Sequence, residues 1–143
     1  LDVAHELGCH YIITLGGLKR EKKSPTPKLY CAASDSDTLH DAISSGAEII
    51  GGQIFGIAGL LIGLGKLRGM RGLCLLAETP GYPDATAARQ ILNMICKMLN
   101  LKVDLGRLDA AAEATRNTLE SFGVITSPTE EKTKKEPRSR WLI

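Results

Sequence analysis

The sequence predicts a single α/β domain in which helices flank a mostly parallel sheet. Short apolar runs alternate with segments whose apolar residues recur at helical spacing, which is typical of this class. The run at 71–78, RGLCLLAE, has no polar alternation, as in a strand covered on both faces. With 143 residues, 43% hydrophobic and 24% charged, the chain has the composition of one globular domain with a real core.

The chain opens with a short helix and a strand. Residues 1–7 have helical character, and Gly8 is placed to end the helix. The β-branched run at 10–17 then predicts a buried strand that ends in a glycine pair. Because the helical pattern begins at the first residue, without a methionine, we expect the chain to start inside a larger protein.

The next elements follow a loop that is rich in charges and prolines. A second strand is expected over 29–34, and a third, shorter strand over 48–52. Between them lies a helix that Gly46 ends. Three polar residues precede this helix and are candidates for its N-terminal cap: Asp35, Ser36 and Asp37.

The second half predicts three helices around the strand at 71–78. They are expected over 56–68, over 85–99 and from about residue 108 to residue 122. Apolar residues of the last helix recur at steps of four and three: Leu108, Ala112, Thr115, Leu119 and Phe122. An apolar seam of two heptads more often packs within its own chain than against another chain in a coiled coil. An oligomer contact is the alternative.

The stretch GGQIFGIAGLLIGLG, at 51–65, allows three interpretations. It lacks the first glycine of a Walker phosphate loop and the hydroxyl residue that should follow Lys66. It also does not match the dinucleotide-binding motif, because the third glycine is displaced by one position. The apolar run at 54–65 is twelve residues long, short of the roughly 20 in a membrane-spanning helix. A closely packed, buried helix remains, with glycines at the contact: Gly52, Gly56, Gly59 and Gly63.

Cysteines and histidines give no sign of a metal site. The four cysteines have no CxxC pair, and the three histidines are not at zinc-ligand spacing to them. We therefore expect buried thiols, no metal and no cofactor, in a reducing, cytoplasmic setting. We expect no nucleic-acid partner either, because aromatic residues are scarce and the net charge of +2 comes from 130–143.

The order of several motifs resembles the proteasome assembly chaperone 2 family, especially its archaeal members: YIITLGGL, LYCAASD, GGQIFGIAGLLIGLGKLRG, CLLAETPGYPD and VDLGRL. The resemblance covers the chain from its first residue to about Phe122. It implies the C-terminal part of a purine nucleoside phosphorylase-like (α/β/α) fold whose N-terminal part is missing here. It also implies a cytoplasmic, oligomeric, non-enzymatic chaperone that binds α subunits of the twenty-S proteasome.

The resemblance also gives the end of the chain a role. We expect an α/β domain over 1–125 and a flexible charged tail over 126–143. Archaeal family members can end in a hydrophobic residue, a tyrosine and a final residue, which enter pockets between α subunits. Trp141 fits the hydrophobic position, Leu142 stands where tyrosine would be, and Ile143 is last. An alternative is that the three residues fold back onto their own domain.

An enzyme that acts on a nucleoside or similar small molecule is the alternative function, with phosphorylase- or hydrolase-like chemistry. Ligands of open parallel sheets collect at the carboxyl ends of the strands. The residues expected to line that edge are Gly16, Gly17, Ser34, Asp35 and Glu78. Glu78 is the best candidate for acid–base work. Against this, no histidine, cysteine or second carboxylate pairs convincingly with it, and its carboxylate could instead organise the following turn.

Overall fold

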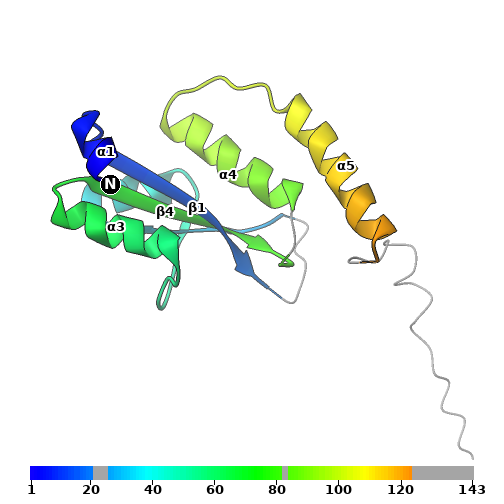
Figure 1. The fold of residues 1–143 in the computed structure, drawn as a ribbon, viewed down its shortest axis with the longest axis horizontal. Coiled ribbons are helices and arrows are strands. Elements are labelled where there is room, and N and C mark those ends of the chain that lie inside the picture. Colours follow the sequence, from blue (N-terminus) through cyan, green and yellow to red (C-terminus); the bar gives the residue numbers. More distant parts are fainter. Residues whose placement is uncertain (21–25, 82–83, 124–143) are drawn as a thin grey trace, which may run out of the picture.

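The computed structural model describes residues 1–20, 26–81 and 84–123. Helices and strands alternate along the chain, as the sequence predicts (Figure 1). Their bounds are α1 (Asp2–Glu6), β1 (Tyr11–Lys19), β2 (Leu29–Ala33), α2 (Ser36–Ser44), β3 (Glu48–Ile49), α3 (Ile57–Leu67), β4 (Arg71–Thr79), α4 (Ala85–Met98) and α5 (Gly106–Ser121).

The four strands form one open sheet in the order β1-β4-β2-β3. Two of the three pairings are parallel, β1 with β4 and β2 with β3. The pairing of β2 with β4 is antiparallel, with Leu29 opposite Ala77 and Ala33 opposite Leu73. The prediction of a mostly parallel sheet flanked by helices is therefore confirmed, and the sheet is mixed at its centre.

Strand β4 lies at the centre of the core because both of its faces are covered by helices. Leu73 and Leu75 are fully buried on the face that packs against α2 and α4. Cys74 and Leu76 point to the opposite face, where they pack against Ile62 of α3. The helices α3 and α4 accordingly lie on opposite faces of the sheet (Figure 1). This double cover is the physical reason for the unbroken apolar run in the sequence.

Helix α5 packs beside α4, at the end of the molecule away from α1 and α3 (Figure 1). An ion pair joins Arg89 of α4 to Asp109 of α5. Within the predicted seam, Leu108 and Leu119 are half-buried, whereas Phe122 is 76% exposed. The seam therefore contributes to packing within the chain at Leu108 and Leu119, and its last residue faces solvent.

Candidate interaction surfaces

The structure does not bring the five candidate ligand residues to one edge of the sheet. Gly16, Gly17 and Glu78 lie near one end, because β1 and β4 are parallel and Leu18 is opposite Glu78. Ser34 lies at the other end, where its N–H donates to Gly72 O at 2.9 Å. The cause is the antiparallel pairing of β2 with β4, which places the end of one strand beside the start of the other.

The carboxylate of Glu78 ties three segments together. It accepts a hydrogen bond from the Tyr30 hydroxyl at 3.0 Å and from the Lys28 backbone N–H at 3.2 Å. Arg20 Nε lies 3.6 Å from the same carboxylate, whose side chain is 15% exposed. These partners belong to the start of β2 and the end of β1. Glu78 therefore holds the ends of neighbouring strands together. The sequence had suggested two other roles for it, acid–base chemistry or organisation of the following turn.

Asp35 is the N-cap of α2 and sits at the opposite end of the sheet. Its carboxylate accepts hydrogen bonds from the Thr38 backbone N–H at 2.9 Å and from the Thr38 hydroxyl at 2.8 Å. Arg71 Nη2 donates to it at 3.0 Å. The Thr38 N–H and then the Arg71 guanidinium lower the pKa of Asp35 well below its usual range. The carboxylate is therefore held charged as a helix cap.

An apolar groove lies beside Gly16 and Gly17, between β1, α4 and α5. Its volume is about 460 Å³. The lining residues are Leu15, Gly16, Gly17, Ala77, Thr79, Asp84, Ala87, Ala88, Ile91, Leu92 and Leu108. The Asp84 carboxylate caps α4, since it accepts hydrogen bonds from the backbone N–H groups of Thr86 at 2.9 Å and Ala87 at 3.2 Å. The sequence did not predict this groove, because the groove forms only where α4 packs on β4 and α5 packs on α4.

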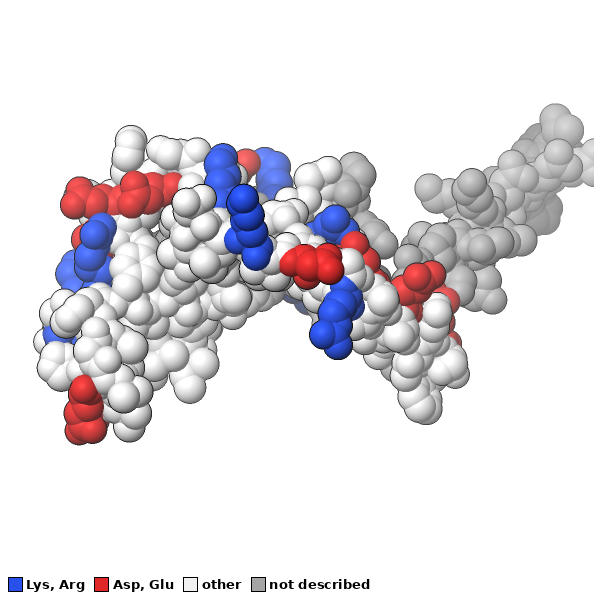
Figure 2. Space-filling view, turned by 90° about the horizontal axis from the view of Figure 1, so that it is seen from above, with Lys and Arg blue, Asp and Glu red and all other residues white. Residues whose placement is uncertain are grey.

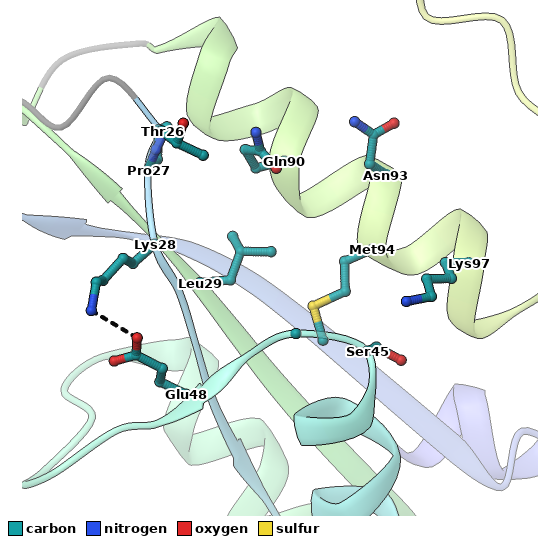
Figure 3. Close-up of a pocket in the computed structure, with 11 residues that line it drawn as sticks. Thr26, Pro27, Lys28, Leu29, Ser45, Glu48, Gln90, Asn93, Met94 and Lys97 are labelled. Atoms are coloured by element: carbon teal, nitrogen blue, oxygen red, sulfur yellow. Dashed lines mark hydrogen bonds and ion pairs between the residues drawn. The ribbon is translucent and has the colours of Figure 1, made fainter.

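A second, more polar pocket opens between the start of β2, the turn after α2 and α4 (Figure 3). Its volume is about 350 Å³, and Leu29 and Met94 form its apolar part. Lys28 Nζ donates to Glu48 Oε1 at 2.7 Å, and this hydrogen bond raises the pKa of Lys28. The amine and the carboxylate therefore neutralise each other across the mouth of the pocket.

Helix α3 carries apolar side chains on both of its sides. The inner side meets the sheet, where Ile62 and Gly65 are buried. The outer side, which we call the α3 outer face, consists of Ile57, Leu60, Leu64 and Leu67. These side chains are 74%, 58%, 36% and 83% exposed, respectively. The prediction of a buried helix is thus right for one side and wrong for the other. The glycines predicted at the contact are also wrong, because a Cβ atom at Gly52, Gly56 or Gly63 would meet nothing within 4 Å, and one at Gly59 would meet only Ile54. Gly65 makes the close approach to the sheet instead, with a Cβ position 2.8 Å from Ile12 Cδ1.

Charged side chains of both signs are interspersed over the face of the molecule shown in Figure 2. Exposed ion pairs of the described residues include Lys28 with Glu48 and Arg68 with Asp2. This face does not present the basic stripe that a nucleic-acid-binding surface usually has.

Three further expectations concern the tail, metals and membranes. Trp141, Leu142 and Ile143 lie outside the described residues, as does the whole stretch 124–143. Within the part of the chain that is described, no group of three or more His, Cys, Asp or Glu side chains could hold a metal ion. Among the same residues, no helix has both the length and the apolar character needed to cross a bilayer. All four cysteines are free thiols. The expectation that they are buried is right for Cys31 and Cys74 and wrong for Cys9, which is exposed, while Cys96 is partly buried.

The fold and these surfaces define an α/β domain with an open mixed sheet, partly buried structural carboxylates at its strand ends and exposed apolar side chains. The chain belongs to the PAC2 family, whose model matches residues 1–122. The family resemblance seen in the sequence is thereby confirmed.

Two solved structures and one curated protein show how this chain relates to known members. PbaB of Pyrococcus furiosus, an archaeal proteasome activator, is 37% identical with a TM-score of 0.72, over 85% of this chain and 54% of that chain. PbaA of the same organism, an archaeal homolog of proteasome-assembly chaperone, is 25% identical with a TM-score of 0.75, over 85% of this chain and 56% of that chain. An uncharacterized protein of Methanocaldococcus jannaschii is 32% identical over 128 residues, 85% of this chain and 48% of that protein.

The chain therefore spans about half the length of the relatives it matches. One solved relative is a proteasome activator and the other is a homolog of a proteasome-assembly chaperone. Both descriptions agree with the chaperone-like role that the sequence predicts.

Proposed function

We propose that this protein assists proteasome assembly by binding α subunits of the twenty-S proteasome, with Trp141, Leu142 and Ile143 as one point of contact. The observation that carries the proposal is the 37% identity to PbaB, an archaeal proteasome activator, at a TM-score of 0.72. The structural roles of Asp35 and Glu78 support the proposal, because both carboxylates already accept hydrogen bonds within the fold, from Arg71 and Tyr30, respectively.

The chemistry of the tail favours a weak contact that gains strength by repetition. Burial of each of its three apolar side chains contributes about 1.5 to 3 kcal/mol, whereas association costs about 4 kcal/mol or more. One tail is therefore a weak ligand. Several tails on one homo-oligomer gain from effective concentration when they meet adjacent α subunits. We accordingly propose that the protein acts as a homo-oligomer, in the cytoplasm.

The test is co-sedimentation of the protein with separately expressed proteasome α subunits, at low and at moderate salt. We expect the intact chain to sediment with α subunits and a chain without Trp141–Ile143 to do so much less. Phe122→Ser is the matched control, because it removes a large apolar side chain, 76% exposed, that lies outside the tail. Absence of co-sedimentation at both salt concentrations would reject the proposed function. Unchanged binding after the deletion would place the contact elsewhere.

A further inference from the structure

Small residues make the groove between β1, α4 and α5 wide enough to receive a bulky side chain. On its sheet side lie Gly17 and Ala77, and on its helix side lie Ala87 and Ala88. Its volume of about 460 Å³ is within the range of about 300 to 1,000 Å³ that is usual for ligand pockets. Leu15 adds an apolar side chain that is 52% exposed. The groove is therefore open, apolar and of a size that suits an aromatic residue.

The described chain ends at a distance from the groove that the following segment can span. Leu108, in the first turn of α5, lines the groove, and α5 ends thirteen residues later at Ser121, about 20 Å away at 1.5 Å per residue. Seventeen residues, 124–140, lie between Gly123 and Trp141. The flexible chain that the sequence predicts there has a mean reach of about 21 to 25 Å. Because reach and distance match, the effective concentration of Trp141 at the groove is near its maximum.

Charge at the groove complements the residues that precede Trp141. Of the described residues that line the groove, Asp84 alone is ionisable, and it is partly exposed. Arg138 and Arg140 come just before Trp141, and no acidic residue follows Glu136. The groove therefore favours the end of this chain over an acidic segment, because Asp84 attracts a guanidinium and repels a second carboxylate.

We propose that Trp141, Leu142 and Ile143 occupy this groove in the free protein and leave it when the protein binds a partner. Burial of the three apolar side chains favours the contact, and the link through 124–140 lowers the cost of association. The proposed function assigns the same side chains to α-subunit contact, so one tail cannot fill both sites at once. The groove thus acts as an autoinhibitory site, and only this regulatory consequence rests on the proposed function.

The test uses the fluorescence of Trp141, which is the single tryptophan of the chain. Ala88→Lys places an amine in the groove, where it takes the space of the indole ring and repels Arg140. This variant should shift the Trp141 emission to longer wavelength and increase its quenching by acrylamide, with the circular dichroism spectrum of the unsubstituted chain. Ala110→Lys is the matched control, because Ala110 is an exposed alanine of α5 that does not line the groove. It should keep the emission of the unsubstituted chain.

Asp84→Asn tests the charge contact separately, because asparagine keeps the cap of α4 and removes the carboxylate. The Trp141 emission should shift to longer wavelength, by less than in Ala88→Lys. An unchanged emission would overturn the contact between Asp84 and the arginines.

Equal emission and quenching in the intact chain and in Ala88→Lys would overturn the occupation of the groove. An emission that depends on protein concentration would show that the tail enters the groove of a second copy, and would overturn the contact within one chain. In titrations with α subunits, Ala88→Lys should bind about two- to tenfold tighter, as expected if about half to nine-tenths of the tails are closed in the intact chain. Equal affinities would overturn the autoinhibition. Absence of α-subunit binding in both chains, with the emission shift intact, would reject the proposed function and leave the groove contact standing.

Discussion

Asp35 joins three parts of the molecule through one carboxylate. It caps α2 through the Thr38 N–H, accepts the Ser34 hydroxyl at 3.0 Å and pairs with Arg71 at the start of β4. A cap residue at this place follows from the sequence, because Asp precedes a helical apolar pattern. The pairing with Arg71 does not, since it depends on the direction of β2. Local signals thus predict the helix cap, and only the tertiary fold reveals the ion pair.

The lowered pKa of Asp35 predicts acid sensitivity. Its folded pKa lies below the unfolded value of about 3.9, so ionised Asp35 contributes stability above that pH, and the contribution is lost as the pH falls further. Asp35→Asn retains a capping oxygen but cannot ionise. Urea midpoints of this variant should fall less steeply than those of the unsubstituted chain below about pH 4. Equal slopes would contradict the assigned charge network.

Asp84 allows the capping contribution to be measured apart from an ion pair. Its carboxylate accepts two backbone N–H groups at the start of α4. Asp84→Ala should lower the free energy of unfolding by about 1 kcal/mol, measured by urea denaturation at neutral pH. Asp84→Asn is the control and should retain most of the stability, because Asn is an equally good N-cap. A large loss in the Asn variant would show that charge, not capping, dominates.

At the scale of elements, periodicity predicts most helix and strand bounds but not how strands pair. The predicted helix at 85–99 and strand at 71–78 correspond closely to α4 and β4. The sequence does not predict the direction of β2 in the sheet, because an apolar run of five residues has the same pattern in parallel and antiparallel pairs. That single reversal separates Ser34 and Asp35 from Gly16, Gly17 and Glu78, and so divides the predicted edge.

Helix α3 shows a second limit of sequence interpretation. The prediction of a buried helix was based on the exclusion of a phosphate loop and a membrane segment, and on glycines that permit close packing. Neither argument states which side of the helix is buried. The sheet covers Ile62 and Gly65, whereas the α3 outer face is exposed.

The two sides of α3 should respond differently to the same kind of truncation. Ile62 is 8% exposed and packs against Cys74 and Leu76, so Ile62→Ala should cost about 3 kcal/mol of unfolding free energy. Leu60 is 58% exposed, so Leu60→Ala should change the stability of the dilute monomer by about 0.5 kcal/mol or less. Thermal or urea unfolding at low protein concentration measures both. Similar losses at the two positions would contradict the assignment of inner and outer sides.

At the scale of the whole molecule, motif order carried more functional information than any candidate site. The ordered motifs identified the PAC2 family, which the family model confirms over residues 1–122. Composition alone supported only a globular domain without a metal or nucleic-acid site. The groove between β1, α4 and α5 arises from packing across distant segments, so no local pattern could have revealed it.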